Sequence, residues 1–114
     1  MKDLKKTKQL VRTIINFHEV NDYESLLAYV SEEEITKGTW FTHKRFMEVC
    51  EAIKTEIGSI TSLEYIGTLK RKTSYLTLWK TTYNKSHDEV LWQIIFDTQN
   101  NRIKLMHINW EQIS

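Results

Sequence analysis

The sequence predicts an α+β fold in which three N-terminal helices pack on a curved, cone-like, four-stranded antiparallel sheet. Up to Ile57, apolar residues recur at the spacing of amphipathic helices. After Gly58 they alternate with polar residues, and β-branched and aromatic side chains predominate. The polar segments between the alternating runs are short, which favours hairpins over the long crossovers that parallel strands require.

The first helix is predicted over residues 4–18 and the second over about 23–30. Asn21 is the predicted N-cap of the second helix, with Glu24 reaching back to it in a variant of the capping box. The apolar stripes of the two helices are Leu4, Val11, Ile14, Ile15 and His18, and then Tyr23, Leu26, Leu27 and Val30. The acidic run after Ser31 is expected to leave the helix, with a turn at Gly38.

The third helix has the clearest limits. Thr42 is its predicted N-cap, and Gly58 follows its last turn as a left-handed C-cap. Its apolar stripe consists of Phe46, Val49, Cys50, Ile53 and Ile57. Cys50 is therefore expected to be a buried and unreactive packing residue.

Strands are predicted at about 59–68, 73–83, 89–97 and 102–110. Val90, Trp92, Ile94 and Phe96 share the face that packs on the helices. Tyr83 opposite Val90 would add Trp79 and Tyr75 to this inner face, and a two-residue turn at Asn100–Asn101 would add Ile103, Leu105 and His107. The other face is also partly apolar, so we expect a second copy of the chain to cover it in a homodimer.

The composition predicts one globular domain over residues 1–114. The net charge of +1 argues against a dedicated nucleic-acid binder. The single Cys50 excludes an internal disulfide, and Met1 is not followed by an apolar run, so we expect a cytoplasmic protein without a signal peptide or membrane span. The three glycines and absent prolines provide neither a linker nor a phosphate-binding loop.

The order of elements resembles the nuclear transport factor two-like superfamily, also called ketosteroid-isomerase-like or cystatin-like. The consistent features are Asn21-Asp-Tyr-Glu-Ser-Leu26, Gly38 before the third helix, Tyr75-Leu-Thr-Leu-Trp79 and Val90-Leu-Trp-Gln-Ile94. The resemblance implies a hydrophobic pocket between the helices and the concave sheet, and dimerisation through the sheet. It implies no single activity, because members include enzymes, ligand-binding proteins and interaction modules.

This chain also departs from that superfamily. Residues 31–40 leave little room for the hairpin that often closes one side of the cone. The isomerase-type site, a tyrosine and a protonated acid with a catalytic aspartate, has no residue-by-residue match here.

The candidate site residues are mostly large rings. Those that could line a ligand pocket are Trp40, Phe46, Tyr65, Tyr75, Trp79, Trp92 and His107. The competing role, which we favour for the rings, is to fill the core or a dimer interface. His107 is also the only catalytic candidate, as a general base, although a hydrogen-bonded structural histidine is the favoured interpretation. The four histidines are scattered, so no metal site is predicted, and no motif indicates a cofactor.

We therefore expect a non-enzymatic homodimer that binds a small apolar ligand or a protein partner. The first alternative is a small isomerase, dehydratase or hydrolase that uses His107 and a pocket tyrosine. The second is a nucleic-acid binder that uses two basic clusters, Lys2, Lys5, Lys6 and Lys8 and then Lys70-Arg71-Lys72.

Overall fold

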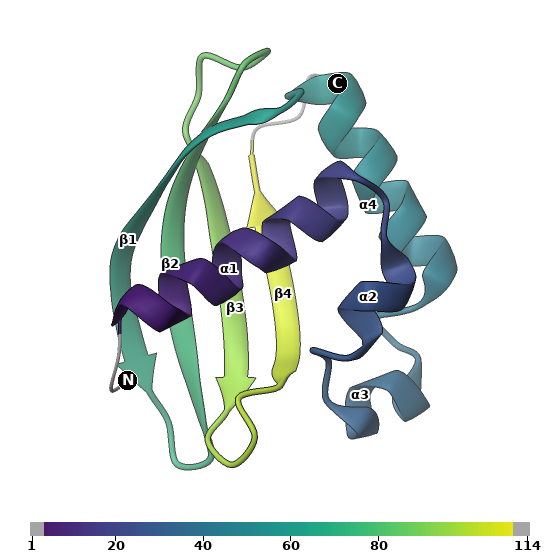
Figure 1. The fold of residues 1–114 in the computed structure, drawn as a ribbon, viewed down its shortest axis with the longest axis vertical. Coiled ribbons are helices and arrows are strands. Elements are labelled where there is room, and N and C mark those ends of the chain that lie inside the picture. Colours follow the sequence, from purple (N-terminus) through teal and green to yellow (C-terminus); the bar gives the residue numbers. More distant parts are fainter. Residues whose placement is uncertain (1–3, 111–114) are drawn as a thin grey trace.

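The computed structural model describes residues 4–110, and in that range four helices precede four strands (Figure 1). The helices are α1 (Leu4–Glu19), α2 (Tyr23–Leu27), α3 (Glu32–Lys37) and α4 (His43–Glu56). The strands are β1 (Ile60–Lys70), β2 (Ser74–Tyr83), β3 (Val90–Asp97) and β4 (Ile103–Asn109). The predicted α+β class and the four predicted strands are confirmed.

The sheet is an antiparallel meander with the strand order β1-β2-β3-β4, as the short connections predicted. Helix α1 crosses one face of the curved sheet, and α4 stands beside the edge strand β4 (Figure 1). The chain between α2 and α3 borders the first residue of β4, where Val30 and Ile103 form a parallel bridge. Along the rest of β4, a groove separates the strand from α4.

The inner face of β2 and β3 contains the predicted residues. Trp79 lies opposite Trp92, and Tyr75 lies opposite Phe96. The register differs by two residues from the one in which Tyr83 lies opposite Val90, because Thr81 is the partner of Val90. A shift of two residues preserves the face on which each side chain lies, so the predicted inner face is still correct.

Of the three residues that a two-residue turn at Asn100–Asn101 would place on the inner face, Ile103 lies there and Leu105 and His107 do not, and a bulge is the reason. Phe96 pairs with Ile103, but the preceding residue, Ile95, pairs with Leu105. The extra residue, Lys104, exchanges the two faces of the strand from that point onward. Leu105 and His107 therefore lie on the outer face, and the side chains that follow the inner face are Met106 and Ile108.

Two expectations for the helices also need correction. The N-cap of α2 is Asp22 rather than Asn21, since its carboxylate accepts hydrogen bonds from Ser25 N (3.1 Å) and Ser25 Oγ (2.6 Å). Asn21 instead ends α1 with a φ of 56°. The acidic run leaves α2 as expected but forms a helix of its own, α3, so residues 4–110 contain four helices where three were predicted. Its glutamates occupy the first turn, where the helix dipole favours negative charge.

Helix α4 has the predicted limits. The Thr42 hydroxyl accepts a hydrogen bond from Arg45 N (3.1 Å), and Gly58 follows the helix with a φ of 90°. A β-carbon on Gly58 would lie 2.1 Å from Asn84 Oδ1, so both the dihedral angle and the space at this position require glycine.

The core lies between α1, α4 and the inner face of the sheet. Its largest fully buried side chains are Trp79, Trp92 and Phe96. Helix α1 contributes Val11, Ile14 and Ile15, and α4 contributes Phe46, Cys50 and Ile53. None of the helices described is long and apolar enough to span a membrane.

Candidate functional site

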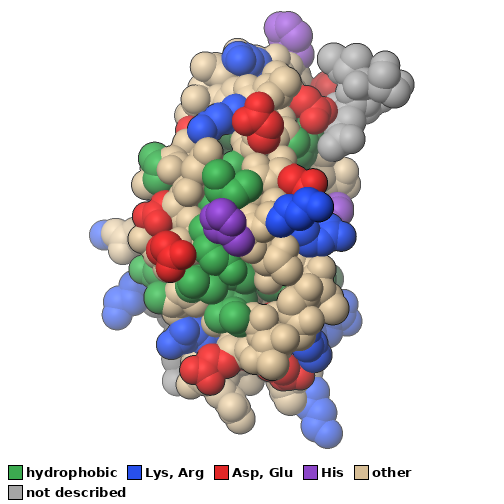
Figure 2. All heavy atoms as spheres, turned by 90° about the vertical axis from the view of Figure 1, so that its right-hand side faces the viewer, with side chains coloured by type: hydrophobic (Ala, Val, Ile, Leu, Met, Phe, Trp, Pro, Cys, Tyr) green, Lys and Arg blue, Asp and Glu red, His purple; other side chains and the backbone are tan. Residues whose placement is uncertain are grey.

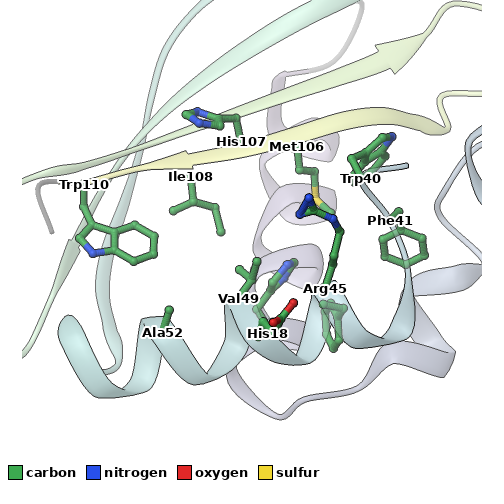
Figure 3. Close-up of a pocket in the computed structure, with 12 residues that line it drawn as sticks. His18, Trp40, Phe41, Arg45, Val49, Ala52, Met106, His107, Ile108 and Trp110 are labelled. Atoms are coloured by element: carbon green, nitrogen blue, oxygen red, sulfur yellow. The ribbon is translucent and has the colours of Figure 1, made fainter. Parts of the chain in front are cut away.

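The groove between α4 and β4 has a volume of about 320 Å³, at the lower end of the range of small-molecule sites (roughly 300–1,000 Å³). Val49 and Ala52 project from α4 towards Ile108 on β4 (Figure 3). The apolar side chains that line the groove are Trp40, Phe41, Phe46, Val49, Ala52, Met106, Ile108 and Trp110. On the side of the molecule that carries α4, hydrophobic side chains form a band bordered by charged ones (Figure 2).

One wall of the groove is formed by α4, because the core buries only part of the apolar stripe of this helix. Phe46, Cys50 and Ile53 are buried against α1 and the sheet. Val49 lies beside this buried stripe and is 37% exposed. The opposite wall depends on the bulge in β4, since that bulge turns Met106 and Ile108 towards α4.

Two tryptophans line the groove, and the indole N–H of each donates a hydrogen bond to a glutamate carboxylate. Trp40 Nε1 donates a hydrogen bond to Glu34 Oε1 in α3 (2.9 Å). Trp110 Nε1 donates one to Glu56 Oε1 at the end of α4 (3.2 Å). These bonds satisfy the polar atom of each ring and fix its orientation, which leaves ring surface available to a ligand.

The charged residues of the groove, Arg45 and Glu48, come from the first two turns of α4. The guanidinium of Arg45 extends from the helix towards Met106 (Figure 3). The ion pairs found among residues 4–110 join Lys37 and Lys80 to glutamates and do not include Arg45. Arg45 is exposed, so it can contact an anionic group at the mouth of the groove.

His18 lines the groove from α1 and is only 4% exposed. Its Nδ1 lies 2.9 Å from the carbonyl oxygen of Ile14, one turn earlier in the helix. The imidazole packs on Phe46 and Trp92, with ring centroids 4.9 and 5.1 Å away. Burial lowers the pKa of His18 to about 4, so the ring is neutral near pH 7.

The predicted pocket residues are divided between the groove and the core. Trp40 and Phe46 line the groove, and Trp92 lies beneath His18. Tyr65 and Trp79 pack on each other on β1 and β2, with ring centroids 5.2 Å apart.

Tyr75, the remaining predicted tyrosine, stacks on Phe96 with a centroid distance of 5.5 Å. Its hydroxyl donates a hydrogen bond to Asn101 Oδ1 (2.8 Å). Together with Tyr65 and Trp79, it extends the core away from the groove.

His107 contributes to the rim of the groove, but its imidazole points away from α4 (Figure 3). On the outer face of the sheet, its Nδ1 lies 3.2 Å from Gln93 Oε1. No acid or nucleophile converges with it there among the contacts of the described chain. The arrangement is that of a hydrogen-bonded surface histidine.

The residues of the groove that the sequence analysis did not select are His18, Phe41, Arg45, Glu48, Val49, Ala52, Met106, Ile108 and Trp110. His18 is on the apolar stripe of α1, a position that indicates burial but not a groove. Met106, Ile108 and Trp110 show the every-other spacing of one strand face. Which face they share depends on the bulge at Lys104, for which the sequence has no visible signal.

Cys50 is fully buried, as predicted, and burial raises the pKa of its thiol to about 11. The thiol is therefore protonated at neutral pH and is a poor nucleophile. Within residues 4–110, no group of three or more histidine, cysteine or acidic side chains could hold a metal ion.

Comparisons of the chain with models of protein families, with curated proteins and with solved structures found no significant match. The protein is therefore classified here by its fold and its groove alone. It is an α+β protein with an aromatic groove between its last helix and the edge strand of an antiparallel sheet.

Proposed function

We propose that this protein is a ligand-binding domain whose groove between α4 and β4 takes a small, largely apolar molecule. The observation that supports this most directly is the pair of tryptophans, Trp40 and Trp110, whose indole N–H groups are already bonded to carboxylates. Between them lies the open, largely apolar groove of about 320 Å³. Aromatic walls with few polar groups are typical of small-molecule sites.

A volume-filling substitution tests this proposal. Ala52 lines the groove, whereas Thr55 is exposed on the same helix and is not part of that lining. The fused-ring compounds 2-naphthol and 2-methoxynaphthalene are suitable probes, and calorimetry measures their affinities. Ala52→Phe should weaken binding at least tenfold, and Thr55→Phe should leave it unchanged. Equal effects of the two variants would contradict binding in the groove.

Self-association through the outer face of the sheet is a second proposal, supported by a different observation. One apolar residue from each strand lies in register across that face: Leu69, Leu76, Ile95 and Leu105. These side chains are not part of the core, and Leu69 is 50% exposed. A second sheet packed on this row at about 10 Å would bury it. Light scattering at tens of micromolar tests the dimer, and a monomeric mass would contradict it.

The order of elements is compatible with the nuclear transport factor two-like superfamily, and we propose membership on that basis alone. The enzymatic alternative has less support, since the His107 imidazole lies outside the groove. Nucleic-acid binding is also less favoured, because Lys70, Arg71 and Lys72 lie together at one hairpin and the net charge of the chain is only +1.

A further inference from the structure

The protonation of His18 determines which of its nitrogens can bind a ligand. The carbonyl of Ile14 can only accept a hydrogen bond, so the proton of the neutral imidazole is on Nδ1. Nε2 therefore carries a lone pair and acts as an acceptor. Within residues 4–110, Nδ1 is the only polar atom of the ring that has a hydrogen-bond partner.

His18 lines the groove, and Nε2 is the nitrogen of its ring that has no hydrogen-bond partner among the described residues. Two side-chain atoms of the described residues are fully buried without a hydrogen-bond partner, Asn21 Oδ1 and Trp79 Nε1. Nε2 is not one of these, although His18 is only 4% exposed. The side chain lines the groove, so its small exposed area opens into that space.

We propose that the ligand presents a hydroxyl or N–H group to Nε2 of His18 at the floor of the groove. This inference rests on the proposed ligand-binding function and specifies the chemistry of the ligand. An acceptor in apolar surroundings favours a donor, because a buried polar group without a partner costs free energy. The ligand class is therefore an aromatic or alicyclic alcohol, phenol or N–H heterocycle.

The same geometry orients the ligand. A carboxylate at the floor would face the lone pair of an uncharged imidazole and would gain no hydrogen bond from it. The positive charge of the groove is that of Arg45, which is exposed at the mouth. If the ligand carries an acidic group, that group lies towards Arg45 and the donor lies towards His18.

Calorimetry with the two naphthalene probes tests the inference. Both have the same fused rings, but only 2-naphthol has a hydrogen-bond donor. One hydrogen bond in an apolar site corresponds to about a tenfold difference in affinity. We expect wild-type protein to bind 2-naphthol about tenfold more tightly than 2-methoxynaphthalene, and we expect His18→Leu to reduce this ratio to about one.

A second measurement does not depend on the folding of a variant. In wild-type protein labelled with ¹⁵N-histidine, 2-naphthol should shift the Nε2 resonance of His18, and 2-methoxynaphthalene should not. Equal affinities for the two probes, with no selective shift, would overturn the role of His18 and leave the groove as an apolar site. If neither probe binds at millimolar concentration, the proposed function fails as well.

Discussion

Trp92 Nε1 donates a hydrogen bond of 3.0 Å to the hydroxyl of Tyr83, and both residues are buried. Burial raises the pKa of Tyr83 to about 12, so the phenol stays protonated and its oxygen remains a neutral acceptor. Trp92 also packs on His18, whose imidazole forms the floor of the groove. The hydrogen bond therefore fixes the indole of Trp92, which packs against His18 at the floor of the groove.

Loss of that acceptor should destabilise the protein. Tyr83→Phe leaves the buried indole N–H of Trp92 without a partner, which should lower the free energy of unfolding by about 1–3 kcal/mol. Tyr29→Phe is a matched control, because no hydrogen bond of its hydroxyl is found among the described residues. Urea denaturation measures both variants. An equal, small effect of the two substitutions would show that the Tyr83 bond contributes little.

The turn after α4 should not tolerate a side chain. Gly58→Ala would combine a φ of 90° with an overlap on Asn84 Oδ1, the atom that accepts a hydrogen bond from Ser59 N. The expected loss is more than about 1 kcal/mol of unfolding free energy. Gly67→Ala is the control, because a β-carbon at Gly67 would meet no atom within 4 Å. It should be neutral or slightly stabilising, and a similar loss for both would refute the local explanation.

The stability of the protein should fall in mild acid because of His18. Its pKa is about 4 in the folded protein, against a reference value of 6.5. Between these values the unfolded chain binds a proton that the folded chain does not. The free energy of unfolding is therefore not reduced by His18 above pH 6.5. It falls as the pH drops from 6.5 towards 4, by about 3 kcal/mol in total.

Urea denaturation between pH 4 and pH 7 measures this dependence. His18→Leu removes the titrating group, so its stability should change less over this interval than that of the wild type. His87→Gln, an exposed position at the β2–β3 turn, is the control and should keep the wild-type slope. If the free energy of unfolding of His18→Leu changes with pH as steeply as that of the wild type, other groups cause the pH dependence.

Self-association should depend on the apolar row of the outer sheet face. Leu105 is at the end of this row and is 40% exposed, so Leu105→Lys places a charge there without disturbing the core. The variant should be monomeric by light scattering at concentrations where the wild type is dimeric. Asn109→Lys, on the same face of β4 but outside the row, should leave the dimer intact. A dimer that persists in Leu105→Lys would place the contact elsewhere.

The parts of the fold that the sequence predicted correctly are those with local signals. Thr42 and Gly58 mark the ends of α4 through their own backbone chemistry, and alternation marks the strands. The candidate site was predicted less well, because it depends on pairing across the sheet. One extra residue at Lys104 moves His107 out of the inner face and brings Met106 and Ile108 into the groove.

His18 shows a second limit of sequence reasoning. Its place on an apolar stripe indicated burial, and the structure confirms that it is buried. The direction of its free nitrogen depends on the hydrogen bond to Ile14 and on the separation of α4 from β4. Both are properties of the packed structure, so no spacing in the sequence could indicate them.

The indole N–H resonances of the tryptophans report directly on whether the groove between α4 and β4 binds a ligand. Trp40 and Trp110 line the groove, whereas Trp79 is fully buried on β2 and is not part of the lining. In ¹⁵N–¹H spectra, addition of 2-naphthol should shift the signals of Trp40 and Trp110 in a saturable way and leave that of Trp79 in place. Unchanged Trp40 and Trp110 signals at millimolar 2-naphthol would contradict a binding site between α4 and β4.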